Sequence, residues 1–154
     1  MGSVIDTPEN LVHTRGMRIL ASTLASYRAN AWTYEQLPTG TREHGHYAYA
    51  VGILQSAPLA DRLRQKNATA HQIRSRVGVR LQMRIRPDNA IADYRTALSA
   101  GVAIRAALVG GASIETTEGP QHWHWEETTN RSVADATGLL IEQIYTVSHR
   151  VTTI

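Results

Sequence analysis

The chain has 154 residues, a formal net charge of +3 and a hydrophobic content of 42%, which predict a single globular domain spanning residues 1–154. It contains no cysteine, which excludes disulfides, thiolate catalysis and cysteine-based zinc sites. No apolar run approaches the ~20 residues that a membrane helix needs, so no membrane partner is expected. Residues 1–7 are expected to be a flexible N-terminal tail, without the basic and apolar regions of a signal peptide.

The first predicted element is a helix from about residue 8 to residue 31. Thr7 is a suitable N-cap, and Pro8 and Glu9 suit the first helical turn. An apolar stripe follows at spacings of three and four residues: Met17, Leu20, Leu24, Tyr27 and Ala31. We expect this stripe to pack on a sheet.

A strand is predicted over residues 47–54, followed by a connector to about residue 70. The next segment, residues 73–86, alternates with a period of two until Pro87 ends it. Its apolar parity consists of Ile73, Val77, Val79, Leu81, Met83 and Ile85. Its basic parity consists of Arg74, Arg76, Arg80, Arg84 and Arg86. The pattern predicts a strand much longer than the usual five or six residues, with one apolar face and one face of arginines.

A second helix is predicted to begin at Asp88, as its cap, and to end at the pair Gly110-Gly111. Its expected packing stripe is Ile91, Tyr94, Leu98, Val102, Arg105 and Leu108. The segment 122–129 alternates aromatic and polar residues as a strand would, and residues 138–151 predict another long strand. Strands outnumber helices, which indicates an α+β fold: a mostly antiparallel sheet with two long strands and two helices packed on one face.

Two H-x-H pairs, His44/His46 and His122/His124, could each clamp a metal if they lie on strands, and Glu126 shares the parity of the second pair. Such spacing is common by chance, so surface or interface histidines are the favoured interpretation. Four acidic residues, which the pattern places in a solvated rim, are Glu115, Glu118, Glu126 and Glu127. No nucleophile or phosphate-loop motif is present, and we expect no catalytic residue, no metal and no cofactor.

The arginine face allows three interpretations: contacts with an acidic protein neighbour, a solvated outer face, or contacts with nucleic-acid phosphates. Aromatic residues do not interleave with these arginines, which argues against base stacking. Long strands leave edges that oligomers commonly use. Trp123 and Trp125 suit interface anchors, although ordinary core packing would also explain them.

The order of elements resembles the tail terminator and tail-completion family of long-tailed bacteriophages. The resemblance is carried by four segments in sequence: an amphipathic helix, the alternating strand, a helix directly after Pro87, and a C-terminal strand. Those segments are "LVHTRGMRILASTLASYRANAW", "HQIRSRVGVRLQMRIRP", "DNAIADYRTALSAGVAIRAAL" and "GLLIEQIYTVSHRVTTI". Residues 53–70 and the "HWHWEE" region have no counterpart in it.

The resemblance implies a structural virion protein of the tail or neck, assembled in the host cytoplasm and without enzymatic activity. Such proteins form a homo-oligomeric ring, typically a hexamer, that caps the tail tube at its head-proximal end and contacts the head–tail connector. DNA passes through the lumen without sequence-specific binding. The residues expected at subunit or tube contacts are Arg74, Arg76, Arg80, Arg84, Trp123 and Trp125.

Two alternatives stay open. Another head–tail connector or neck protein of similar fold would have the same order of elements. A nucleic-acid-binding module using the basic strand 73–86 would account for the arginines without a ring.

Overall fold

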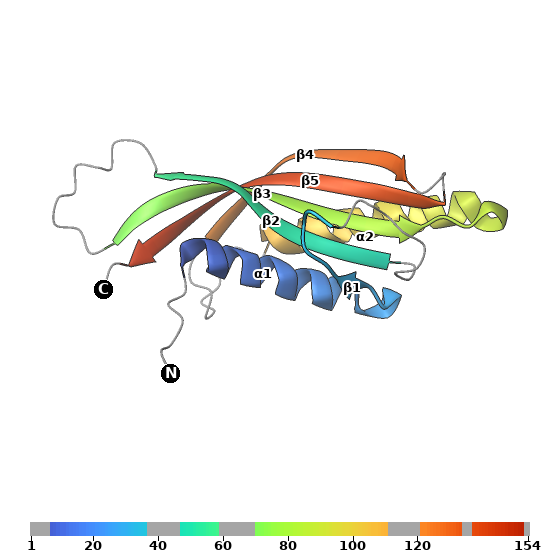
Figure 1. The fold of residues 1–154 in the computed structure, drawn as a ribbon, viewed down its shortest axis with the longest axis horizontal. Coiled ribbons are helices and arrows are strands. Elements are labelled where there is room, and N and C mark those ends of the chain that lie inside the picture. Colours follow the sequence, from blue (N-terminus) through green and yellow to red (C-terminus); the bar gives the residue numbers. More distant parts are fainter. Residues whose placement is uncertain (1–6, 37–46, 59–69, 111–120, 134–136, 153–154) are drawn as a thin grey trace.

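The computed structural model describes residues 7–36, 47–58, 70–110, 121–133 and 137–152. Their five strands form one sheet with the order β1-β2-β3-β5-β4, along which two helices lie (Figure 1). The strands are β1 (Asn30–Ala31), β2 (Tyr47–Pro58), β3 (Ala70–Arg84), β4 (Gln121–Val133) and β5 (Gly138–Thr152). The helices are α1 (Pro8–Thr23) and α2 (Ala90–Gly110), with 3-10 turns at Ala25–Tyr27 and Pro87–Asn89.

The α+β class is confirmed. All pairings among β2, β3, β5 and β4 are antiparallel, and the short β1 adds one parallel pairing to β2. Both β3 and β5 have 15 residues, and their register is unbroken from Ala70↔Thr152 to Arg84↔Gly138. β2 and β4 have 12 and 13 residues, so they are nearly as long. All four strands have at least twice the usual length of about five or six residues.

Both helices pack on the same face of the sheet. The alternation of β3 places Val77, Val79, Leu81 and Met83 under them, all essentially inaccessible to solvent. Apolar residues of β5 continue this layer, which makes one core with the two helices. The buried β5 members are Leu139, Ile141, Tyr145 and Val147.

Helix α1 is shorter than predicted, but the predicted stripe packs as expected: Leu20 and Leu24 are buried in the core, and Met17 and Tyr27 pack against it. It begins at Pro8 with the Thr7 hydroxyl accepting from the Asn10 backbone N–H at 3.0 Å, as the sequence indicates. It ends at Thr23, and Arg28 in the left-handed region (φ 56°) redirects the chain into β1. The predicted continuation to residue 31 is therefore wrong. The buried residues of α1 itself are Val12, Arg15, Gly16, Ile19 and Leu20.

At Gly16 the backbone of α1 lies close to the sheet. A Cβ at this position would lie 3.1 Å from Val51 on β2 and 3.4 Å from the Trp123 ring on β4. Glycine lowers the intrinsic stability of a helix, but at this position it lets the backbone of α1 pack closely on the strands. The Arg15 guanidinium crosses to α2 and donates to the Leu108 carbonyl at 3.4 Å, in the last turn where carbonyls lack helical partners.

The link from β3 to α2 depends on an ion pair that the sequence did not indicate. The Asp93 carboxylate accepts from the Arg86 backbone N–H at 2.8 Å and from both arms of its guanidinium at 2.9 Å, and Asn89 donates to it at 3.1 Å. These hydrogen bonds from Arg86 hold the pKa of Asp93 well below its usual range. Asp93 therefore anchors the start of α2, whereas Asp88, the predicted cap, is exposed.

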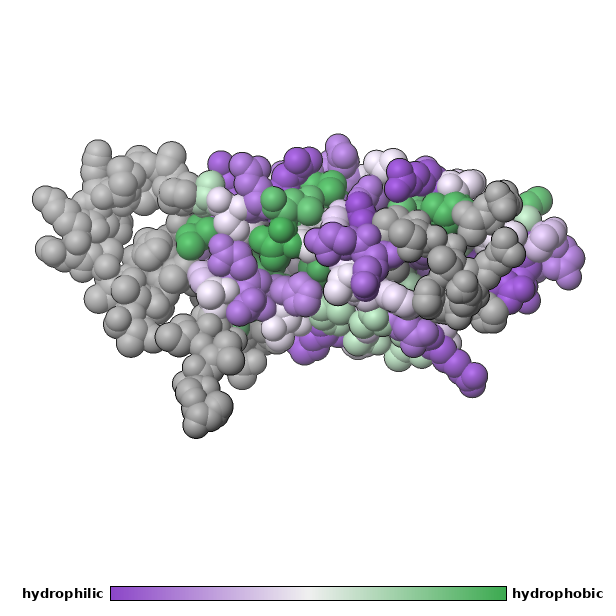
Figure 2. Space-filling view, in the orientation of Figure 1, coloured by the Kyte–Doolittle hydropathy of each residue, from purple (hydrophilic) through white to green (hydrophobic). Residues whose placement is uncertain are grey.

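Neither described helix is long and apolar enough to cross a membrane. Hydrophobic side chains nevertheless reach the surface between hydrophilic ones (Figure 2). The most exposed large apolar residues are Leu54, Ile91, Tyr94, Val102, Val109 and Trp125.

Candidate interaction surfaces

The face of the sheet opposite the helices carries the arginines of β3, as their parity predicts. Arg74, Arg76 and Arg84 are exposed, while Arg80 is only 17% exposed. Gly78 interrupts the arginine series between Arg76 and Arg80. The basic face thus has a covered centre at Arg80 and exposed arginines on either side of it along β3.

Arg80 lies in that covered centre, bound to two residues of its own chain. Its Nε donates to Glu142 on β5 at 2.8 Å, and its Nη1 donates to the Tyr34 carbonyl at 2.7 Å. The guanidinium also lies 3.8 Å from the centre of the Tyr34 ring, a cation–π distance. The Tyr34 hydroxyl donates to the same Glu142 oxygen at 2.9 Å.

The ionisation of this cluster follows from its surroundings. Burial raises the pKa of Tyr34 to about 12, and the hydrogen bond to Glu142 adds to the effect. Burial alone would raise the pKa of Glu142, but hydrogen bonds from Arg80 and Tyr34 outweigh it and lower that pKa. Arg80 is therefore an internal structural cation whose donors are used within the chain. Of the four arginines expected at subunit or tube contacts, Arg80 is the one that is mostly covered.

Two glycines make room for Tyr34. Gly52 on β2 and Gly78 on β3 are paired across the strands, and a Cβ on either would lie within 2.8 Å of Tyr34 atoms. The segment after β1 can therefore lie flat on the outer face of the sheet. The sequence signal was a glycine inside each of two predicted strands, which is typical of close approach by another segment.

The two candidate tryptophans have different surroundings. Trp123 is 3% exposed, packs edge-to-face on Tyr145 at 5.5 Å between ring centres and donates to Gln121 at 2.9 Å. It belongs to the core and cannot anchor an interface from there. Trp125 is 38% exposed, and the Arg105 guanidinium of α2 lies 4.3 Å from its ring centre.

Helix α2 presents an apolar stripe to solvent. The sequence predicted that Ile91, Tyr94 and Val102 face the core, but they are 71%, 44% and 51% exposed. The side that faces the sheet combines small residues with Ile104 and Leu108, and Leu108 is the buried member of the predicted stripe. The Gly101 carbonyl, for example, accepts from the buried Gln143 amide of β5 at 2.8 Å. The buried residues of α2 are Asp93, Ala97, Ala100, Gly101, Ile104 and Leu108.

The prediction that Ile91, Tyr94 and Val102 face the core was wrong because α2 is apolar around most of its circumference, so hydrophobicity does not distinguish its sides. Ile91, Tyr94, Leu98, Val102 and Val109 recur at spacings of three, four and seven residues, so they share one side of the helix. At 1.5 Å per residue this stripe extends about 27 Å. The described residues cover one side of the helix and leave this apolar stripe exposed.

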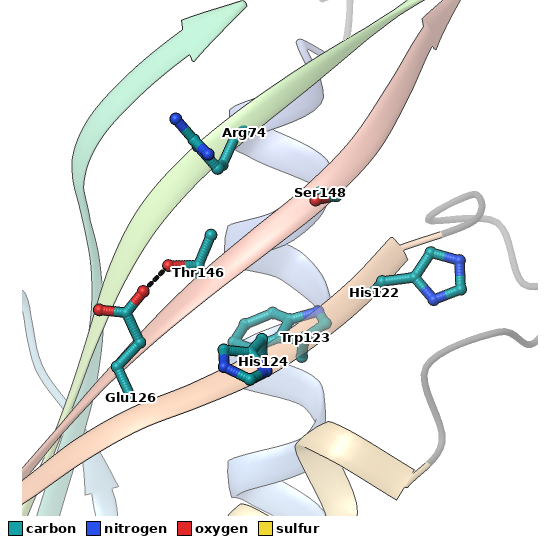
Figure 3. A pocket seen from close by; sticks show the side chains of 7 residues that line it. All are labelled: Arg74, His122, Trp123, His124, Glu126, Thr146 and Ser148. Carbon is teal, nitrogen blue, oxygen red and sulfur yellow. Dashed lines mark hydrogen bonds between the residues drawn. The ribbon is translucent and has the colours of Figure 1, made fainter. Parts of the chain in front are cut away.

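His122 and His124 are exposed and lie on the outer face of the sheet. Together with Arg74, Trp123, Glu126, Thr146 and Ser148 they line a shallow groove across β3, β5 and β4 (Figure 3). Glu126 sits at a β-bulge and accepts a hydrogen bond from the Thr146 hydroxyl. No group of three potential metal ligands occurs among the described residues. The predicted pair His44/His46 and the acidic residues Glu115 and Glu118 lie outside the described residues.

No protein-family model matches the sequence, and no curated protein does either. A solved structure shares the fold. A chain from the virion of a native gene transfer agent (GTA) particle superimposes with a TM-score of 0.58 at 17% identity, covering 90% of this chain and 91% of that one. The bacteriophage SPP1 gp17 protein aligns over 92% of both chains, at 12% identity and a TM-score of 0.34. At this identity the first likeness establishes a common fold.

Proposed function

We propose that this chain is a structural protein of a tailed virion or virion-like particle. Its role would be that of a tail terminator: a homo-oligomeric ring, six copies in the family it resembles, at the head-proximal end of the tail tube. The observation that carries the proposal is the exposed apolar stripe of α2. Monomers seldom leave such a stripe to water, whereas subunits of closed assemblies bury one against each neighbour.

The shared fold with a chain of a gene transfer agent virion supports the same proposal, because that chain is by its name part of a virion particle. The likeness extends over nine-tenths of both chains. It does not separate a terminator from another neck protein of similar fold. The terminator role rests on the resemblance in the order of elements.

In this proposal the two exposed surfaces have different tasks. The α2 stripe, residues 91–109, packs against a second copy. The exposed arginines Arg74, Arg76 and Arg84 with Trp125 contact the tube, the connector or a neighbouring subunit. DNA would pass through the lumen without base-specific contacts.

Nucleic-acid binding by strand 73–86 is supported less well. Within the chain, Arg80 is bound to Glu142 and Arg86 is bound to Asp93. A duplex-binding surface commonly makes six to ten phosphate contacts, roughly, and loses affinity steeply with salt. A salt series with duplex DNA would reveal that behaviour if it existed.

Electron microscopy of particles made without this chain tests the proposal. A terminator stops addition of tube subunits, so its removal should give tails of uncontrolled length that lack heads. Restoring the chain should restore uniform, joined tails. Tails of normal length joined to heads in its absence would contradict the terminator role.

A further inference from the structure

Strand β4 forms one edge of the sheet (Figure 1), and among the described residues it pairs only with β5. Along such an edge, alternate residues aim their backbone N–H and C=O groups away from the sheet, where another strand can pair with them. A β-bulge at Glu126 interrupts the first part of β4. From Glu127 to Val133 the register with β5 is unbroken, and this segment contains no proline, glycine or lysine. The second part of β4 is therefore a regular edge that is open to strand addition.

Two opposite charges lie on the outer face of this segment. Glu127 pairs with Ile144 of β5 and Arg131 pairs with Leu140, so their side chains point to the same side of the sheet, away from the helices. Both residues are exposed. They lie four residues apart, about 13 Å along a strand, which is too far for an ion pair within one copy.

Glu127 and Arg131 make no side-chain ion pair or hydrogen bond within the described part of the chain. Arg131 lies within electrostatic range of Glu142 on β5. The carboxylate of Glu142, however, already accepts hydrogen bonds from Arg80 and Tyr34. Glu127 and Arg131 are therefore placed to meet charges on a second strand.

We propose that two copies of this chain pair antiparallel along the β4 edge, about a two-fold axis through Thr129. In that register Glu127 of each copy lies opposite Arg131 of the other copy, and the two Thr129 side chains lie opposite each other. Opposite charges and threonine pairs are both favourable when they face each other across antiparallel strands. The segment is thus complementary to itself, as a contact between two identical surfaces requires.

Charge selects this register and this partner strand. A two-fold axis through Glu127 or through Arg131 would place like charges directly opposite each other, which is unfavourable. The other edge that a second copy offers is β2 beyond its short pairing with β1. Residues 50–58 of β2 contain no charged side chain, so pairing with them would leave Glu127 and Arg131 unmatched.

This contact goes beyond the proposed ring. A cyclic ring joins two different surfaces of each copy, whereas the β4 contact joins the same surface twice and cannot close a ring of six by itself. We assign it to the free chain, where it covers an edge that otherwise invites addition of unrelated strands. The isolated chain tests it, so its failure leaves the terminator role standing, and loss of the terminator role leaves the dimer standing.

Sedimentation equilibrium of the isolated full chain, over a range of concentrations at low ionic strength, measures the pairing. Glu127→Arg and Arg131→Glu should each weaken the dimer at least about tenfold, because two attractive pairs across the axis become two repulsive ones. The double variant Glu127→Arg/Arg131→Glu exchanges the charges and should restore dimerisation. Arg28→Glu, the same charge change beside β1 at the opposite edge, should have no effect.

A single introduced cysteine tests the register, because the chain contains none of its own. Residues opposite each other in antiparallel strands have Cα atoms about 4.5–5.5 Å apart, which suits a disulfide. Thr129→Cys, on the axis, should therefore give a covalent dimer on mild oxidation. Ser132→Cys is also exposed, but its two copies would lie about 20 Å apart along the strands and should cross-link far more slowly.

A chain that stays monomeric at every concentration would overturn the inference. A dimer that resists both single substitutions would overturn it too, because the contact would then lie on another surface, such as the α2 stripe. Failure of the double variant to recover, with its circular dichroism unchanged, would refute the charge pairing. Equal cross-linking of the two cysteine variants would refute the two-fold axis through Thr129.

Discussion

Arg80 and Glu142 are joined by a 2.8 Å hydrogen bond across the central strands β3 and β5, and Tyr34 covers them both. An arginine that the sequence places in an exposed basic strip is therefore part of the internal structure. Two glycines open the space for Tyr34. Arg80 is therefore distinguished from Arg74 and Arg76, which are exposed on the same strand, and substitutions can compare them.

The first prediction concerns stability. Arg80→Ala removes the cation from Glu142 and Tyr34, each partly buried, and should lower the free energy of unfolding by about 1–3 kcal/mol. Arg76→Ala, on the same strand and exposed, should change it by less than about 0.5 kcal/mol. Urea denaturation measures both. Equal stability of the two variants would show that the Arg80 cluster contributes nothing to the fold.

The second prediction concerns the space that Gly52 and Gly78 leave for the Tyr34 ring. Gly78→Ala would place a Cβ 2.6 Å from Tyr34 Cζ, so the ring must leave its position. We expect a loss of about 1–3 kcal/mol, the usual cost of forcing atoms into a packed site. Gly110→Ala, where a Cβ meets nothing within 4 Å, serves as the control and should not destabilise. An unaltered Tyr34 environment in NMR spectra of Gly78→Ala would contradict the packing.

The third prediction concerns the start of α2. Asp93→Ala should destabilise the chain by about 1–3 kcal/mol, because it leaves the Arg86 backbone N–H and guanidinium without their acceptor. Arg86 itself is half exposed, so water recovers part of this loss. Asp88→Ala, which removes an exposed acid one turn earlier, should be nearly neutral. The opposite ranking would restore Asp88 as the cap.

The fourth prediction concerns pH. His149 is 5% exposed, and its Nε2 lies 3.1 Å from the buried Ser75 hydroxyl. Burial lowers the pKa of His149 below the usual 6.5, and the negative charge of Glu9 opposes this shift without cancelling it. The unfolded chain therefore binds a proton more readily than the folded one. Stability should be full above about pH 6.5 and decrease as the pH falls towards the lower folded-state value.

The variant His149→Gln supplies the comparison for this pH effect. Its stability, measured by urea denaturation from about pH 7.5 to about pH 5.5, should fall less than that of the unaltered chain. Glutamine can still hydrogen-bond Ser75, so loss of that contact does not confound the slope. Identical pH slopes for the two proteins would exclude His149 as the titrating group.

The fifth prediction concerns self-association through α2. Val102→Glu places a charge in the apolar stripe and should abolish ring formation while leaving circular dichroism and the unfolding midpoint nearly unchanged. Ala103→Glu, also exposed but turned by 100° around the helix, should still assemble. Negative-stain microscopy of tail assembly mixtures distinguishes them. Equal assembly by both variants would exclude the stripe as a subunit contact.

Periodicity predicted the sheet well. The alternation of β3 and β5 is strong because one face is buried under helices, so their bounds and faces agree with the structure to within a few residues. The N-cap at Thr7 and the end of α2 at Gly110 were also correct, since both depend on local backbone chemistry. The α+β class followed from these elements.

The face of α2 was harder to predict. Ile91, Tyr94 and Val102 face solvent, whereas Ala97, Ala100 and Gly101 face the sheet with Ile104 and Leu108, so ranking by size selected mostly the wrong side. In the first helix, Arg28 adopts a left-handed conformation that the run of apolar residues before it does not indicate. The cluster of Arg80, Tyr34 and Glu142 joins residues up to 108 positions apart, which no local pattern reveals.

Cryo-electron microscopy of intact particles, at a resolution that traces this chain in the neck, tests the central claim most directly. We predict a closed ring of identical copies at the head-proximal end of the tail, with residues 91–109 of each copy buried against a neighbour. A single copy per particle, a location away from the tail, or an α2 stripe exposed in the assembled ring would contradict it.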